Sequence, residues 1–162
     1  MIILGIDPGS RTCGYGLLEI NKNKIIAAGC GSINIKPSLN LSERLLFIYN
    51  ELSSLIQKYK PTVAAVETIF FGKNIQSSFT LGHARGVILL ALAENNITLK
   101  EYSPREIKQS VVGNGNASKK QVEFMVQSIL NLKNQPVNND AADALAAALC
   151  LFNKEKFALM QL

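Results

Sequence analysis

The chain has 162 residues, of which 48% are hydrophobic and 18% charged, and this balance is typical of a folded globular protein. A chain of this length buries roughly 70% of the surface that its unfolded form exposes, so residues 1–162 are expected to form one domain. The net charge of +5 and the pI of about 9.2 favour a polyanionic partner only weakly.

Several classes of protein are disfavoured by the same inventory. The longest apolar run, residues 86–93, is far shorter than the ~18 residues of a membrane span, and no basic segment or secretory signal precedes the first strand. Cys13, Cys30 and Cys150 are scattered, which gives neither a disulfide framework nor metal-ligand spacing. With His83 as the single histidine, a zinc enzyme is disfavoured. We therefore expect a cytoplasmic protein with reduced thiols.

Hydrophobic periodicity predicts five strands and five helices. The first three strands have short connections, as in an antiparallel meander, and the later alternation predicts β-α-β crossovers. The expected fold class is therefore α/β, with a five-stranded mixed sheet flanked by helices. The predicted elements are strands at 2–6, 13–20 and 24–35, a helix at 41–59, a strand at 62–67, a helix at 75–94, a strand at 97–102, and helices from 104, 118 and 138, the last ending at about 152.

Two helix starts carry capping signals. Ser103 with Glu106, and Ser118 with Gln121, have the spacing of a capping box, and Pro104 occupies the first helical position. Residues after about 153 are predicted to form a short C-terminal tail.

Four carboxylates stand out as candidates for chemistry. Asp7 and Glu67 each end a buried strand, where ligand sites of open α/β sheets tend to lie, although either could simply begin a loop. Asp140 and Asp143 share one face of an Ala- and Leu-rich helix. The helix dipole could account for Asp140 near the N-terminus, but it explains Asp143 poorly.

A set of ligands with oxygen donors only indicates Mg²⁺, with Mn²⁺ as a substitute. Four carboxylates can hold two such ions about 3.5–4 Å apart, the arrangement for in-line attack on a phosphodiester. On this basis alone the substrate stays unspecified.

Several stretches together resemble the RuvC family of Holliday junction resolvases, in that family's order and spacing. They are ILGIDPG at 3–9, GYG at 14–16, VE at 66–67, FF at 70–71, LGHARG at 81–86, IKQSVVG at 107–113 and DAADALA at 140–146. The resemblance covers residues 1 to about 152. One departure is that many members carry a histidine where this chain has Leu149, Cys150 and Leu151.

The resemblance implies a ribonuclease H-like fold, a homodimer, and Mg²⁺-dependent paired nicking of opposed strands of a four-way DNA junction, leaving 5′ phosphates. It also implies cooperation with the RuvA–RuvB branch-migration complex in recombination and repair. It assigns catalysis and metal binding to Asp7, Glu67, Asp140 and Asp143, base stacking to Phe70, and DNA contact to Lys108 and Lys119, while Lys73 and Arg85 are further candidates for DNA contact.

Gly82 and Gly86 form a small-residue stripe on a predicted helix, which could pack within the domain or lie in a dimer interface. Three rival functions stay open: an actin-like ATP-binding domain, a non-catalytic junction-binding protein, and a nuclease of the same fold acting on another branched DNA or structured RNA.

Overall fold

The computed structural model describes residues 1–21, 24–69, 74–132 and 137–159, and of residues 157–159 it describes the backbone only. Phe70, Phe71 and Lys73 lie outside the described residues. Within the described residues, no helix is long and apolar enough to cross a membrane.

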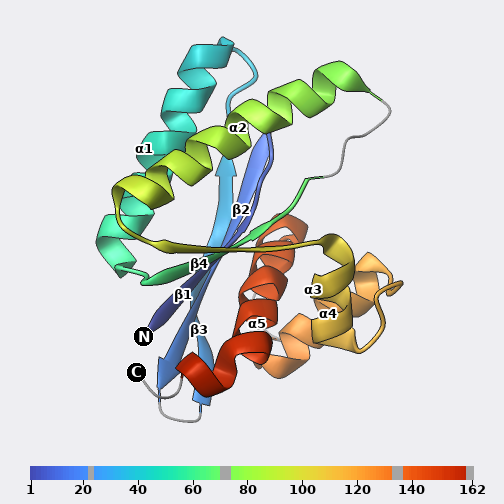
Figure 1. Cartoon of the computed structure of the whole chain (residues 1–162). Coiled ribbons are helices and arrows are strands. Elements are labelled where there is room, and N and C mark those ends of the chain that lie inside the picture. The colour runs from blue at the N-terminus through green and yellow to red at the C-terminus, as the bar shows by residue number, and fades with distance from the viewer. Residues whose placement is uncertain (22–23, 70–73, 133–136, 160–162) are drawn as a thin grey trace.

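The centre of the molecule is a mixed five-stranded sheet, as predicted (Figure 1). Its strands, in the order β3-β2-β1-β4-β5, are β3 (Lys24–Asn34), β2 (Thr12–Asn21), β1 (Ile2–Asp7), β4 (Val63–Glu67) and β5 (Thr98–Tyr102). The first three pair in antiparallel fashion, while β1, β4 and β5 are parallel. The carboxyl ends of β1 and β4 therefore lie side by side.

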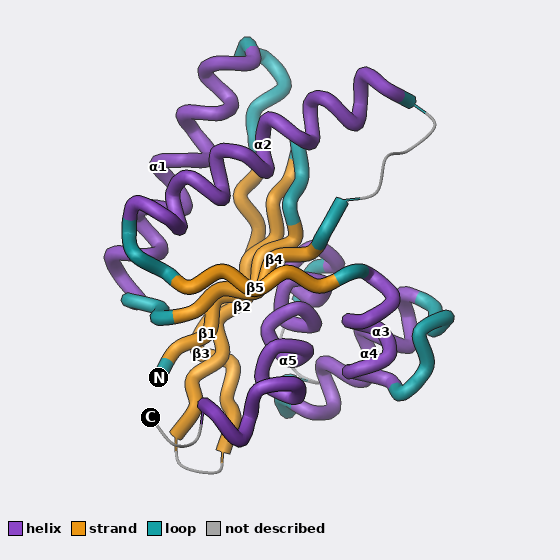
Figure 2. The backbone as a smooth tube through the Cα atoms, in the orientation of Figure 1, coloured by secondary structure: helices purple, strands orange, loops and turns teal. Residues whose placement is uncertain are grey.

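Helices cover both faces of the sheet (Figure 2). One face carries α1 (Leu41–Tyr59) and α2 (Ile75–Glu94). The other carries α3 (Pro104–Val112), α4 (Lys119–Ile129) and α5 (Asn139–Leu159). The three-layer α/β architecture expected from the sequence is confirmed.

The alternation of side chains along β1 and β4 decides which way the acidic residues face. Ile3 and Ala65 belong to the core under α5, whereas Leu4 and Val66 belong to the core under α1 and α2. Because side chains alternate with a period of two, Asp7 and Glu67 continue the face that α5 covers.

Helix α5 lies close against the sheet because its contact surface is built from small residues. A Cβ added at Gly5 would overlap the carbonyl of Ala144, and one at Gly16 would come within 2.8 Å of Leu145. This close approach places the first turn of α5 beside β2, where the backbone of Asp140 lies against Gly14. Gly14 is the residue paired with Asp7.

The predicted end of the last helix was wrong, because α5 continues to Leu159 instead of ending at about 152. The apolar run stops there, but the polar residues that follow make ion pairs with the rest of the domain: Lys154 with Glu106, and Glu155 with Lys100. These contacts stabilise the helix beyond Phe152, so the residues predicted to form a C-terminal tail belong to α5 as far as Leu159. Both predicted capping boxes, at Ser103 and Ser118, are present.

Candidate active site

Three of the four predicted carboxylates meet at one pocket. Asp7 and Glu67 reach this pocket from the carboxyl ends of β1 and β4, and Asp143 reaches it from the second turn of α5. Lys108 from α3 and Lys119 from α4 face them across a cavity of about 190 Å³. The remaining lining residues, none of them predicted, are Pro104, Ile107, Val122 and Ala146.

The fourth carboxylate, Asp140, does not line this pocket but acts on it electrostatically. It contributes to the raised pKa of Asp7, and its backbone packs on Gly14. The turn that carries it is held by Asn138, whose Oδ1 accepts a hydrogen bond of 2.8 Å from the backbone N–H of Ala141. The Nδ2 of Asn138 donates to Ser32 Oγ on β3. The contact of Asn138 with Ser32 was missed in the sequence because the two residues are 106 positions apart.

The pocket disfavours the ionised form of two of its carboxyl groups. Burial raises the pKa of Asp7 from 3.8 to about 7, together with the charges of its acidic neighbours, of which Glu67 has the largest effect. The pKa of Glu67 is also raised, first by burial and then by the charge of Asp143. Asp143 is the one residue from Ala141 to Phe152 that is not fully buried, consistent with a side chain turned into the pocket.

Lys119 supplies the closest opposing charge. Its Nζ lies 3.0 Å from Asp143 Oδ2, which raises the pKa of Lys119 through a hydrogen bond and through charge. The lysine side chain is 77% exposed, so its ammonium is also within reach of a ligand at the pocket mouth. Lys108 acts on Glu67, since its positive charge opposes the rise in the pKa of that carboxyl.

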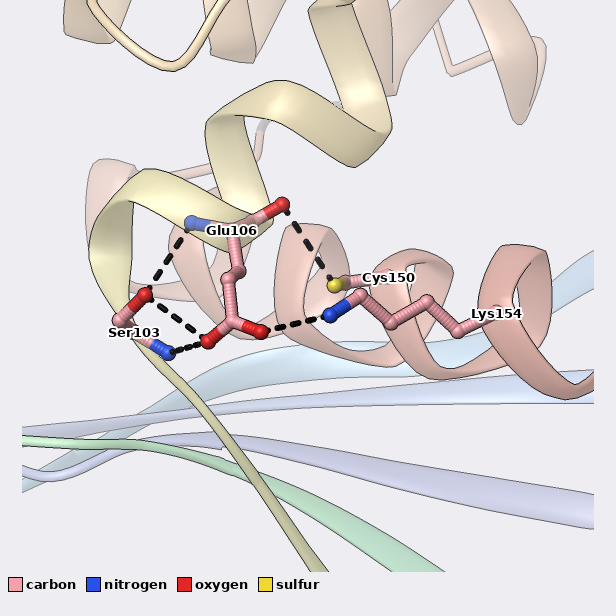
Figure 3. Close-up of polar contacts among 4 residues, drawn as sticks. All are labelled: Ser103, Glu106, Cys150 and Lys154. Carbon is pink, nitrogen blue, oxygen red and sulfur yellow. Dashed lines mark hydrogen bonds and ion pairs between the residues drawn. The ribbon is translucent and has the colours of Figure 1, made fainter.

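Helix α3, which carries Lys108, is fixed to α5 through Glu106 (Figure 3). One carboxylate oxygen of Glu106 accepts hydrogen bonds from the backbone N–H and hydroxyl of Ser103, both at 2.9 Å. The other oxygen pairs with Lys154 Nζ at 2.7 Å. These contacts, led by the one with Lys154, lower the pKa of Glu106 to about 2. One side chain thus caps α3 and ties it to the helix of Asp143.

The donor set fits a hard divalent cation. Carboxylate oxygens are the ligands that Mg²⁺ prefers, and a cation would relieve the repulsion that raises the pKa of Asp7. Among the described residues, no three His, Cys, Asp or Glu side chains already converge as a metal cage. Binding of one ion by three carboxylates therefore requires side-chain adjustment around Asp143, which Lys119 holds.

Arg85 lies outside this pocket and is largely buried. Its guanidinium forms an ion pair with Glu101, the β5 residue paired with Val66, and its side chain is 19% exposed. DNA contact by Arg85 stays a prediction, as do the roles of Phe70 and Lys73 outside the described residues.

The sheet order and the helices on both faces define a ribonuclease H-like domain, and a pocket lined by acidic residues lies at the ends of β1 and β4. The family model for crossover junction endodeoxyribonuclease RuvC matches residues 3–151. The chain belongs to this family.

Relatives and solved structures agree with that assignment. The chain is 47% identical over 156 residues to the RuvC crossover junction endodeoxyribonuclease of Ruminiclostridium cellulolyticum, covering 96% of this chain and 94% of the relative. It is 45% identical to that of Heliobacterium modesticaldum, covering 93% of each. Thermus thermophilus RuvC in complex with a Holliday junction substrate superposes with a TM-score of 0.90 at 30% identity, covering 98% of this chain and 96% of the other.

Proposed function

We propose that this protein is a Holliday junction resolvase, an endonuclease that nicks two opposed strands of a four-way DNA junction during recombination and repair. The observation that carries the proposal is the pocket that brings Asp7, Glu67 and Asp143 together with Lys108 and Lys119. Family membership supplies the junction as substrate. A cytoplasmic location, and cooperation with the RuvA–RuvB branch-migration complex, go with this proposal.

We assign metal binding to Asp7, Glu67, Asp140 and Asp143. Four ionised carboxylates and the two lysines, Lys108 and Lys119, have a formal charge of −2, which repels a phosphodiester. One divalent cation would neutralise this charge, and two would make it positive, so the charge balance favours two Mg²⁺ or Mn²⁺ ions. When bound, Mg²⁺ lowers the pKa of a coordinated water and stabilises the leaving 3′ oxygen.

The chain's own residues bind and orient the DNA around this centre. Lys108 and Lys119 are placed to contact the scissile phosphate and its neighbour, because both line the pocket opposite the acidic residues. Lys119 can turn from Asp143 towards a phosphate oxygen by side-chain rotation, since its side chain is largely exposed. Phe70 is assigned to stacking on unpaired bases at the junction, worth ~1–3 kcal/mol per base.

A homodimer gives this activity its symmetry, because two opposed strands of a two-fold symmetric junction need two active sites. Helix α2 offers a surface for the second copy. Ile75, Phe79 and Leu90 are 71%, 67% and 60% exposed along it, and a Cβ at Gly82 or Gly86 would meet no atom of the described residues within 4 Å. Among these residues nothing packs on the two glycines, so they leave room for another helix.

Cleavage of matched substrates tests the proposal. With Mg²⁺, the protein should place paired symmetric nicks in a mobile four-way junction and leave linear duplex, flap DNA and structured RNA uncut. Asp7→Asn should slow cleavage by at least about 10³-fold while junction binding stays within roughly threefold. Equal cutting of linear duplex or structured RNA would overturn the substrate assignment, and full activity of Asp7→Asn would overturn the site.

A further inference from the structure

The connection between α3 and α4, residues 113–118, is tightly held although it lies at the surface. It starts at Gly113, whose φ of +82° suits glycine. Gly115 lies against Arg105, where an added Cβ would come within 2.7 Å of the arginine Cγ. Near the end of the connection, Ala117 is buried and only 2% exposed. Its path is thus fixed at its start, middle and end.

One side chain on α3 bridges the first half of this connection. The Nε2 of Gln109 donates to the backbone oxygen of Gly113 at 2.9 Å, and its Oε1 accepts from the backbone N–H of Gly115 at 3.0 Å. Both ends of the amide are used. A carboxylate could keep the contact with Gly115 but would face the Gly113 carbonyl with no hydrogen to donate.

The same connection leads directly into the active site. Ser118 caps α4, accepting a hydrogen bond from the backbone N–H of Gln121 and donating its own N–H to Gln121 Oε1 at 2.8 Å. Lys119 is the first residue of α4, and its Nζ contacts Asp143 Oδ2 at 3.0 Å. Three residues thus separate Gly115, which Gln109 holds, from Lys119 in the catalytic pocket.

We propose that Gln109 is a positioning residue of the active site, which sets the start of α4 and so places Lys119 against Asp143 and the DNA. This inference rests on the proposed nuclease function, because its effect on catalysis is read through that reaction. Gln109 does not line the active-site pocket, and its side chain holds the backbone of Gly113 and Gly115. A misplacement of about 1 Å at a catalytic group can cost roughly 10²-fold in rate, so loss of one brace should cost about 10-fold.

The test compares Gln109→Ala with a matched control in full-length protein. Asn153→Ala also removes an exposed amide that makes two hydrogen bonds to this helix, to the backbone oxygen and hydroxyl of Ser110 at 3.2 and 3.3 Å. Its bonds tie α3 to α5 and do not involve residues 113–118. Single-turnover cleavage of a four-way junction at saturating protein separates the rate of the chemical step from binding.

We expect Gln109→Ala to slow the chemical step about 10-fold, with junction affinity within roughly threefold, and Asn153→Ala to change the rate less than about twofold. Gln109→Glu, which keeps the acceptor for Gly115, should fall between Gln109→Ala and wild type. In a Lys119→Ala background the effect of Gln109→Ala should vanish, because a residue that acts through Lys119 has nothing left to position. An undiminished effect in that background, or equal slowing by Asn153→Ala, would overturn the proposal.

A readout without activity separates this proposal from the nuclease assignment. In Gln109→Ala, hydrogen exchange at the backbone N–H of Gly115 should speed up along with that of the first turn of α4, while exchange in α5 stays unchanged. Unchanged exchange at the backbone N–H groups of Gly115 and Gln121, which the structure holds by hydrogen bonds, would refute the positioning role even if the variant were slow. A wild-type protein that cuts no four-way junction would refute the proposed function and leave the exchange result to stand alone.

Discussion

Asp7 lies within electrostatic reach of the three other acidic candidates, and its charged form is opposed first by burial and then by their charges. Its pKa of about 7 in the folded chain lies above the ordinary value of 3.8. Between these two values the folded protein holds a proton that the unfolded chain has released. Raising the pH across this window therefore favours unfolding, and the stability attached to this proton is lost above a pH of about 7.

Asp7→Asn should remove this pH dependence when no divalent cation is present. In EDTA at pH 8, the variant should be more stable than wild type and its Tm should be higher by at least ~3 °C, since 1 kcal/mol shifts the Tm of a domain of this size by roughly 2–4 °C. The difference in Tm should shrink towards pH 4. Melting curves of both proteins from pH 4 to 8 measure it.

Addition of Mg²⁺ at pH 8 supplies the control. Wild type should gain thermal stability because the bound cation offsets the repulsion among the carboxylates around Asp7. Asp7→Asn should gain less, because it has one carboxylate fewer to bind the cation. A Tm difference between the two proteins that does not change with pH would show that the pKa of Asp7 is not raised in the folded protein.

The acidic residues could be picked out as candidates from the sequence because three of them, Asp7, Glu67 and Asp143, stand in otherwise apolar segments. A charge that ends an apolar strand, and a second aspartate inside an Ala-rich helix, are visible without the fold. The ion pair of Arg85 with Glu101 was not predictable, since it depends on how α2 crosses β5. The same holds for Asn138 and Ser32, and for the pairing of Lys119 with Asp143.

Among the elements, α5 decides the geometry of the site because it crosses the sheet and carries two of the acidic residues. Its backbone comes close to β1 only because Gly5 has no side chain. A methyl group there would collide with the carbonyl of Ala144, which is backbone and cannot rotate away, and with the Cβ of Ala148 at 2.9 Å.

Gly5→Ala should therefore destabilise the fold by about 3 kcal/mol or more, the upper end of the cost of overpacking, and lower the Tm by roughly 6–12 °C. Gly29→Ala is the matched control in strand β3, where the nearest atom to an added Cβ is the Tyr59 hydroxyl at 3.3 Å. It should change stability by less than about 1 kcal/mol, because that side chain can shift. Urea unfolding of both variants measures the difference, and equal destabilisation would contradict the close packing of α5.

The order and type of the ten elements in the described residues could be predicted, because periodicity or a cap marks them in the sequence. The end of α5 could not. Residues 153–156 look like a polar tail in the sequence, and they are helical because Lys154 and Glu155 find partners on α3 and β5. Local sequence patterns therefore predict which elements form, while the end of α5 depends on contacts with residues distant in the sequence.

For the whole molecule, the exposed apolar face of α2 predicts that two copies pair through this helix and that each copy cuts one strand of the junction. Leu90 is 60% exposed there, and Phe124 is 63% exposed on α4, which covers the opposite face of the sheet. Leu90→Asp should place a charge in the proposed dimer interface and weaken dimerisation by at least about 10-fold, whereas Phe124→Asp should leave it unchanged. Sedimentation equilibrium without DNA measures both, and equal effects would place the interface elsewhere.

The loss of the dimer should also change the products and not only the rate. On a supercoiled plasmid with an extruded cruciform, a first nick releases the supercoiling that holds the junction open. A second nick must follow before the protein leaves, so wild type should yield linear plasmid. Leu90→Asp should yield nicked circles, because a single active site cuts one strand and the junction is then reabsorbed. Linear product from a variant shown to be monomeric would mean that one copy can cut both strands in turn, and the symmetry argument for α2 would fail.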